Sequence, residues 1–288
     1  MARVIGIISG KGGVGKTVVA INLATSLSKH YRKNVLLVDA NITTPHVGLY
    51  LGLYSTLFTL NDVVKGYAEA DKAVYNHASG VHVIPASLRS EDLKYLDWRA
   101  AKDRLPAVFS DYDFVLMDSS PGFGRESLIT LGICGEAIFV TNPIMNSVAD
   151  LIKCNNISRE LNVRALGIVL NMVRNKKYEI GRREVEEIVE LGVLGSIPYD
   201  DRIMESIVQK KPAIDISPKL DREFMKLSAH LVGPAGSPAR KPGLFSRLFG
   251  RKLEKKEAKA KKEEKSKHGP DKIKEHQNTI SDKTKVSA

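Results

Sequence analysis

The chain has 288 residues, of which 43% are hydrophobic and 27% charged, and its formal net charge is +11. This length can bury one large hydrophobic core, although length alone would also permit two small domains. Residues 240–288 hold 16 Lys/Arg against 7 Asp/Glu, so they carry +9 of the net charge and residues 1–239 carry only +2. The basic character therefore belongs to the C-terminal segment, and it does not indicate a nucleic-acid-binding face on the globular part.

Membrane-spanning and disulfide-rich classes are not indicated. No apolar run approaches the roughly 20 residues that cross a bilayer, and the first predicted strand begins too early to leave room for a signal peptide. The two cysteines, Cys134 and Cys154, form no C-x-x-C motif. We expect two buried thiols in a reducing cytoplasm, in a protein that is soluble or at most attached to a membrane surface.

A glycine-rich segment follows the first predicted strand, Val4–Ile8, and precedes the first predicted helix, Val18–His30. It reads Gly10-Lys11-Gly12-Gly13-Val14-Gly15-Lys16-Thr17 and matches the phosphate-binding pattern G-x-x-x-x-G-K-[ST] in its strand-to-helix context. The glycines let backbone N–H groups point at phosphate oxygens, and the helix adds its positive end. Lys16 can then reach the β- and γ-phosphates, and the Thr17 hydroxyl can ligate Mg²⁺. We predict a nucleotide site from Gly10 to Val18.

Lys11 is the unusual residue of this segment, because a generic phosphate loop needs no second lysine after its first glycine. Alone, Lys11 is also consistent with a solvated charge, and the later motifs decide against that interpretation. The run KGGVGKT resembles the deviant Walker A motif of the MinD/ParA class of dimerising ATPases. The resemblance covers nearly all of residues 1–252. It implies an ATPase that sandwiches ATP and Mg²⁺ between two copies, with Lys11 crossing to the nucleotide of the other copy.

Short apolar runs alternate with longer amphipathic runs, which is typical of a parallel sheet wrapped by helices. We predict strands at Val4–Ile8, Asn34–Val38, Val81–Ile84, Phe114–Met117, Ala137–Thr141, Ala165–Leu170 and Val193–Ile197. We predict helices at Val18–His30, Leu60–Val64, Trp98–Phe109, Ser147–Glu160, Arg182–Glu190, Arg202–Lys210 and Lys219–Val232, the last one capped by Ser217-Pro218. The expected fold is one α/β domain over residues 1–232, doubly wound, with a mainly parallel sheet of about seven to eight strands.

The second predicted strand leads into Asp39-Ala40-Asn41. An isolated aspartate here would be better interpreted as a turn cap, but its position matches the family's first switch segment and favours a Mg²⁺ ligand. Asn41 departs from the family's D-x-D pattern, in which the second Asp is assigned to the attacking water. An asparagine can orient that water but cannot accept its proton. We therefore predict slow hydrolysis, since phosphoryl transfer depends mainly on positioning and charge stabilisation.

The fourth predicted strand leads into Asp118-Ser119-Ser120-Pro121-Gly122-Phe123-Gly124. An aspartate that ends an apolar strand has the form of a Walker B carboxylate, which reaches Mg²⁺ directly or through water. Pro121, Gly122 and Gly124 permit a loop that rearranges when the γ-phosphate leaves. The segment is similar to the family's second switch. We therefore predict Thr17, Asp39 and Asp118 as the metal ligands.

Later segments add matches that rest on the resemblance. Thr141-Asn142-Pro143 is similar to the family's T-N-P segment, and Asp150 matches a position near the dimer interface, although a solvated helix charge is an equally good interpretation. Asn171 ends the sixth predicted strand and offers the donor and acceptor that adenine recognition requires. Met172 stands where the family usually has Arg. Pro198 lies in the segment that lines the other side of the base, and ordinary turn chemistry is an equally good interpretation of Asn171.

The C-terminal segment holds a second sequence pattern that bears on function. We predict a linker at 233–242, an amphipathic membrane-targeting helix at 243–252 and a disordered Lys/Glu-rich tail at 253–288. Spacing puts four apolar side chains on one stripe of that helix, among basic residues, which suits an interface with anionic lipid: Leu244, Phe245, Leu248 and Phe249. The helix also resembles the C-terminal targeting helix of the MinD class. The alternative is a basic tail that docks on its own domain or on a partner.

These features together predict a cytoplasmic ATPase that dimerises with ATP and binds reversibly to the inner face of the cell membrane. In the MinD class this switch positions division sites or other cellular structures, through an activator or cargo that the sequence does not identify. A ParA-like partition ATPase is disfavoured because the basic excess lies in the tail. An iron–sulfur carrier would need cysteine motifs that are absent from the sequence. An ATP-binding scaffold with little hydrolysis remains open because of Asn41.

Overall fold

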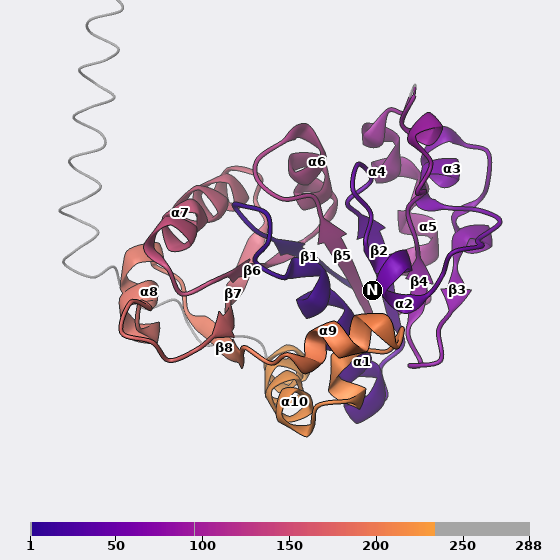
Figure 1. Ribbon diagram of the computed structural model, residues 1–288. Coiled ribbons are helices and arrows are strands. Elements are labelled where there is room, and N and C mark those ends of the chain that lie inside the picture. The colour runs from indigo at the N-terminus through magenta and orange to yellow at the C-terminus, as the bar shows by residue number, and fades with distance from the viewer. Residues whose placement is uncertain (1, 95, 234–288) are drawn as a thin grey trace, which may run out of the picture. The chain divides into compact units, whose positions relative to one another are not determined.

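The computed structural model describes residues 2–94 and 96–233 (Figure 1). Strands in these ranges form one sheet in the order β3-β4-β2-β5-β1-β6-β7-β8. All neighbouring strands are parallel except β3, which is antiparallel to β4. The strands are β1 Arg3–Ile8, β2 Val35–Ala40, β3 Tyr75–Asn76, β4 His82–Ile84, β5 Phe114–Ser119, β6 Glu136–Thr141, β7 Arg164–Val173 and β8 Val193–Pro198. The predicted doubly wound, mainly parallel sheet is confirmed.

Helices cover both faces of this sheet. They are α1 Lys16–Tyr31, α2 Val47–Leu51, α3 Leu60–Lys65, α4 Ala101–Arg104, α5 Pro106–Phe109, α6 Arg125–Ile133, α7 Met145–Glu160, α8 Arg182–Val189, α9 Arg202–Val208 and α10 Pro218–Val232. Short 3-10 segments are η1 Ala70–Ala73, η2 Ser90–Leu93, η3 Trp98–Ala100 and η4 Ala213–Asp215. Helices α1 and α10 pack side by side (Figure 1).

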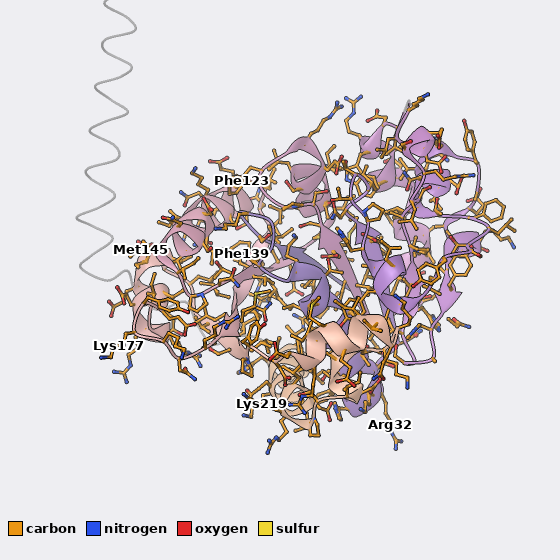
Figure 2. All side chains as sticks on the ribbon, viewed as in Figure 1. Arg32, Phe123, Phe139, Met145, Lys177 and Lys219 are labelled. Atoms are coloured by element: carbon orange, nitrogen blue, oxygen red, sulfur yellow. The ribbon has the colours of Figure 1, made fainter. Side chains whose placement is uncertain are left out.

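The pleat of the strands divides the core between the two faces. Successive residues point to opposite sides, so Ile7 packs with α1 and α10 whereas Ile8 packs with α7 and α8. A third cluster joins Leu36 and Val38 of β2 to α3, α4 and α5. All six residues of β2, and all six of β5, are buried, as expected for central strands covered on both sides. Phe139 lies in the interior, and charged side chains such as Arg32 and Lys219 point outward (Figure 2).

Several elements differ from the sequence prediction. The helix predicted at Trp98–Phe109 is instead η3, α4 and α5, and α5 begins at Pro106. A proline has no N–H to donate within a continuing helix, so it suits the first turn of a new one. The short α2, α6 and the two-residue strand β3 were not predicted. The cap predicted for the last helix is confirmed, because the Ser217 hydroxyl accepts from the Leu220 N–H at 3.2 Å.

Helix α10 ends at Val232, and Gly233 is the last residue that the structure describes. The remainder of the predicted linker (234–242), the predicted amphipathic helix (243–252) and the predicted tail (253–288) lie outside the described residues. Within residues 2–94 and 96–233, no helix combines the length and the apolar composition that crossing a membrane requires.

Candidate nucleotide site

The phosphate loop connects β1 to α1 at the centre of the sheet. Gly13 has φ of 78° and Gly15 has φ of 85°, in the left-handed region that glycine adopts without strain. Gly15 is the residue before the first turn of α1, which begins at Lys16. The loop backbone and the N-terminus of a 16-residue helix therefore meet at the end of a buried strand, as an anion site requires.

Two lysines of the loop lie in different surroundings. Lys16 is buried, with 8% of its surface exposed, whereas Lys11 is half-buried. Burial lowers the pKa of Lys16, and the nearby charge of Asp118 opposes this shift. Buried ammonium groups are stable only when paired. The phosphates of a nucleotide would supply that pairing.

Thr17 and Asp118 are joined directly, because the Thr17 hydroxyl donates to Asp118 Oδ2 at 2.6 Å. Asp118 is a direct neighbour of Asp39 across the β2–β5 pairing. The other Asp118 oxygen, Oδ1, is buried and has no hydrogen-bond partner among the described residues. Burial raises the pKa of Asp118, while Lys16 and Thr17 oppose that shift. The three predicted metal-site residues are therefore brought together.

Asp39 holds the start of α2. Its Oδ2 accepts from the N–H groups of His46 at 3.1 Å and Val47 at 2.9 Å, and its Oδ1 accepts from Asn41 N at 3.3 Å. The pKa of Asp39 is raised well above its usual range, first by burial and then by the negative charge of Asp118. These backbone hydrogen bonds oppose the shift. Asp39 therefore links the metal region to the conformation of the segment after β2.

The donors at this edge fit Mg²⁺. Two buried carboxylates side by side repel each other, and the orphaned Oδ1 of Asp118 needs a partner. Mg²⁺ prefers oxygen ligands, and it is usually held by one or two carboxylates, substrate phosphates and water. Thr17, Asp39 and Asp118 would hold such an ion, which would neutralise charge on transferring phosphoryl oxygens.

The side chain of Asn41 is bound locally. Its Nδ2 donates to the Thr44 carbonyl at 2.6 Å, and its Oδ1 accepts from the Thr44 hydroxyl at 3.1 Å. The side chain is also buried. Both polar ends of the amide that we predicted to orient the attacking water are thus engaged by Thr44.

The predicted base-site residues come from the adjacent ends of β7 and β8. Asn171 Nδ2 donates to the Val14 carbonyl at 2.8 Å, and Asn171 Oδ1 is buried without a partner in the described part of the chain. Pro198 ends β8 and pairs with Val173. Met172 has φ of 58°, which interrupts the regular register between these two strands. The structure therefore places a free amide oxygen directly behind the phosphate loop.

Two contacts near this edge were not anticipated from the sequence. The guanidinium of Arg174 stacks over the ring of Tyr199, 3.6 Å from its centroid, beside Pro198. Glu126 of α6 accepts hydrogen bonds from Thr43 and Ser120, which belong to the two switch loops. No sequence spacing pointed to the contact of Arg174 with Tyr199 or to that of Thr43 with Glu126, because each joins segments far apart in the chain.

The remaining predicted residues surround the loop. A Cβ at Gly10 would lie 2.4 Å from the Cβ of Asp150, so α7 packs directly on the first glycine of the loop. Asn142 Nδ2 donates to the Asn171 carbonyl at 3.2 Å. Gly122, with φ of 77°, donates its N–H to the Ser9 carbonyl at 3.0 Å. The loop after β5, the segment after β6 with α7, and the end of β7 therefore all contact the phosphate loop or its support.

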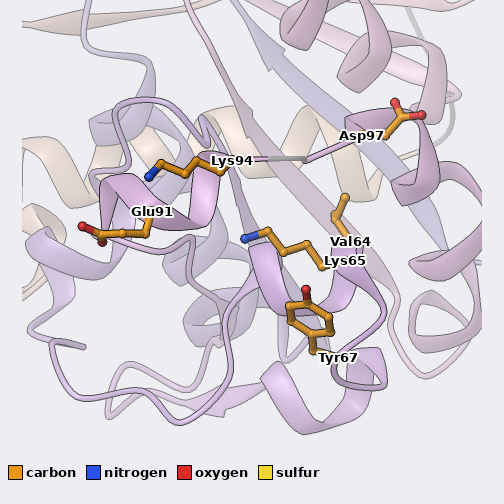
Figure 3. A pocket seen from close by; sticks show the side chains of 6 residues that line it. All are labelled: Val64, Lys65, Tyr67, Glu91, Lys94 and Asp97. Carbon is orange, nitrogen blue, oxygen red and sulfur yellow. The ribbon is translucent and has the colours of Figure 1, made fainter.

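A separate hollow lies beside α3 (Figure 3). Two lysines and two acids share its lining with two other residues, and the six are Val64, Lys65, Tyr67, Glu91, Lys94 and Asp97. Their charges oppose one another, and none of them is a predicted site residue. The phosphate loop, and not this hollow, therefore carries the candidate site.

Comparison with known proteins agrees with this assignment. The family model described as "ParA: NUBPL iron-transfer P-loop NTPase" matches residues 1–232. An uncharacterized ATP-binding protein of Methanocaldococcus jannaschii is 32% identical over 88% of this chain and 98% of its own length. The septum site-determining protein MinD of Escherichia coli is 29% identical over 87% of this chain and 100% of its own length.

Solved structures show the same similarity. The cell division ATPase MinD of Pyrococcus furiosus has a TM-score of 0.76 and 31% identity, covering 79% of this chain and 97% of that one. MinD of Pyrococcus horikoshii, solved with Mg-ADP, has a TM-score of 0.77 and 30% identity, covering 81% of this chain and 96% of that one.

The iron-transfer part of the family description finds no matching donors in this chain. Iron–sulfur clusters are held mainly by sets of cysteine thiolates. Cys134 follows α6 and Cys154 lies within α7, and both are free and buried. Burial raises the pKa of both thiols, to about 12 for Cys154. These two residues do not fit a cluster.

Proposed function

Because the chain belongs to the MinD/ParA family of P-loop ATPases, we propose that it hydrolyses ATP with Mg²⁺ and dimerises with ATP held between two copies. The observation that carries this proposal is the contact between Thr17 and Asp118 beside the buried Lys16, with Lys11 in the same loop. Phosphate, metal and partner contacts would thus converge on one loop.

Each residue has a role in this proposal. Residues Gly10 to Val18 bind the phosphates, and Lys16 stabilises charge on the γ-phosphate. Thr17, Asp39 and Asp118 hold Mg²⁺, and Lys11 reaches the nucleotide of the other copy. Asn171 and Pro198 contact the base, for which the free Asn171 Oδ1 would accept from an exocyclic amine. Asn41, once released from its hydrogen bonds to Thr44, positions the attacking water, with slow turnover because it cannot take up a proton.

Exposed apolar side chains support dimerisation at this edge. Leu128 of α6 and Ile144 before α7 are each 37% exposed, and Met145 is 54% exposed. They belong to helices that follow the strands on either side of β1, which carries the phosphate loop. Apolar surface near a site of this kind is typical of a surface that becomes covered in a complex.

Membrane association is proposed from the sequence of 243–252. Full burial of a large apolar side chain contributes about 1.5–3 kcal/mol, and an interface buries it only in part. A basic residue near an anionic leaflet adds about 1 kcal/mol. A helix of about a dozen residues is marginal in water, so ordering it offsets much of this gain. One copy would bind weakly, and two copies joined by ATP would bind firmly through their high effective concentration.

This coupling gives the proposed cellular role. The ATP-bound dimer would associate with the inner face of the cell membrane and recruit an activator or cargo, and hydrolysis would release it into the cytoplasm. The relatives named MinD support division-site or similar positioning as the process.

Light scattering with a hydrolysis-blocking ATP analogue and Mg²⁺ tests the dimer, with ADP as control. We expect a dimer with the analogue and a monomer with ADP. Co-sedimentation with vesicles containing anionic lipid tests the anchor, with Phe245 and Phe249 replaced by alanine as the matched variant. A protein that stays monomeric at saturation refutes the sandwich, and equal pelleting in every arm refutes the switch.

A further inference from the structure

One side chain contacts both loops that flank the metal site. Glu126, in the first turn of α6, accepts a hydrogen bond from the Thr43 hydroxyl through Oε1 and from the Ser120 hydroxyl through Oε2, the latter at 2.6 Å. Thr43 belongs to the loop that follows Asp39, and Ser120 lies two residues after Asp118. The carboxylate of Glu126 therefore bridges the two segments that carry the metal-site aspartates.

Glu126 is not engaged in capping its own helix. The residue before α6 is Gly124, and the Ser127 hydroxyl bonds the carbonyls of Gly122 and Gly124. The neighbouring Arg125 pairs with Asp97, at 3.9 Å. Both partners of Glu126 are hydroxyl groups from other parts of the chain. Hydrogen bonds to a carboxylate are stronger than those between neutral groups, so the bridge restrains both loops.

Other contacts tie each loop to a different place. Asn41 and Thr44 bond to each other within the loop after β2. In the loop after β5, Gly122 is bonded to Ser9 of the phosphate-loop region. The pairing of β2 with β5 joins the strands that precede these loops. In the described residues, the two hydrogen bonds to Glu126 then connect the loops themselves.

We propose that Glu126 is a positioning residue for hydrolysis, which makes the two switch loops move as one unit when the γ-phosphate binds and leaves. This inference rests on the proposed ATPase function. It assigns to α6 a role in timing hydrolysis, and none in binding the nucleotide. The phosphate loop binds the nucleotide whether or not the two switch loops are coupled.

The test combines steady-state kinetics with hydrogen exchange on the full chain. Glu126→Ala should lower kcat about tenfold or more while KM changes little, the pattern of an interaction needed only in the transition state. Without ligand, it should speed amide exchange in both residues 41–47 and residues 119–124. Glu126→Gln keeps one acceptor and gains a donor, so it should restore part of kcat.

Glu184→Ala is the matched control, because Glu184 is an exposed glutamate in the first turn of α8. It should leave kcat and exchange in both loops unchanged. Double-mutant cycles that combine Glu126→Ala with Thr43→Ala or with Ser120→Ala add a second criterion. Once Glu126 is alanine, these changes should have no further effect on kcat.

The outcomes separate the two proposals. If calorimetry detects no binding of Mg·ATP to the wild type, the proposed function fails. If the wild type binds and hydrolyses ATP and Glu126→Ala has the same kcat, the role of Glu126 is refuted. Fully additive losses in the cycle, or faster exchange in one loop alone, also refute the coupling.

Discussion

Asn171 Nδ2 donates a hydrogen bond to the Val14 carbonyl at 2.8 Å, which fastens the end of β7 to the phosphate loop. Both residues are buried. Leaving a buried polar group without its partner costs about 1–3 kcal/mol, so the loop conformation and the Asn171 side chain depend on each other. A Cβ at Gly15 would lie 2.2 Å from this same nitrogen. Gly15 is therefore required by packing as well as by backbone conformation.

We predict that Gly15→Ala abolishes nucleotide binding. The new methyl group collides with Asn171, and the φ of 85° strains any residue with a side chain. The free energy of unfolding should fall by about 2 kcal/mol or more. Gly181→Ala is the matched control, because Gly181 precedes α8 with φ of −67° and a Cβ there meets no atom within 4 Å. Thermal melts with and without Mg·ATP measure both effects, and a Gly15→Ala protein that ATP still stabilises would contradict the prediction.

The two lysines of the loop should separate binding from dimerisation. Lys16→Ala should remove nucleotide binding measured by calorimetry, because the buried ammonium group, which interacts with the charge of Asp118, is the one placed to pair with the phosphates. Lys11→Ala should leave nucleotide binding within about threefold of the wild type, since Lys11 would contact the other copy. Light scattering should then show a monomer with the ATP analogue. A stable dimer of Lys11→Ala would show that Lys11 does not cross the interface.

Asn41→Asp should raise the rate of ATP hydrolysis by about tenfold or more, since a fully effective positioned base contributes roughly 10²–10⁴-fold. A carboxylate cannot donate to the Thr44 carbonyl, so the side chain would leave its present contacts and accept a proton from water. Thr44→Ala removes the Thr44 hydroxyl that donates to the Asn41 side chain, but it adds no base. Phosphate release assays should show a gain for the first variant alone. Equal rates for wild type and Asn41→Asp would show that the asparagine does not limit turnover.

The metal-site carboxylates should make stability depend on pH. The pKa values of Asp39 and Asp118 are raised from 3.8, so in the folded, ligand-free protein they keep their protons to higher pH than in the unfolded chain. The folded state then binds more protons, and stability falls as pH rises from about 4 through the folded pKa values. Thermal melts across this range should show the decline. Asp39→Asn should flatten it, and a profile identical to wild type would contradict this origin.

Binding of the metal should release protons under the same conditions. Mg²⁺ requires both carboxylates in their charged form, so Mg·nucleotide binding at a pH below the folded pKa values displaces protons into the buffer. Calorimetry in two buffers of different ionisation enthalpy measures that release. Nucleotide alone, without Mg²⁺, is the control and should release fewer protons. Equal release in the two titrations would show that the carboxylates are already charged.

The alternation of strands and helices was predictable from the sequence because each strand is a compact apolar run. The four central strands, β1, β2, β5 and β6, all match predicted strands to within one or two residues. Of the elements that were missed, α2 and β3 are short and β3 lies at the edge of the sheet, where local preference is weak. The break between α4 and α5 reflects Pro106, which the periodicity of apolar residues does not register.

What the sequence determined by itself was the phosphate loop, since eight contiguous residues with two left-handed glycines suffice to specify an anion site next to a strand and a helix. The parallel direction of the strands then follows from their alternation with helices. The tertiary structure alone shows how the two carboxylates of the predicted metal site meet. Asp39 and Asp118 are 79 positions apart in the chain and become neighbours through the register of β2 and β5. The same holds for Glu126 and Thr43, which are 83 positions apart, because long-range hydrogen bonds depend on packing geometry that no local pattern encodes.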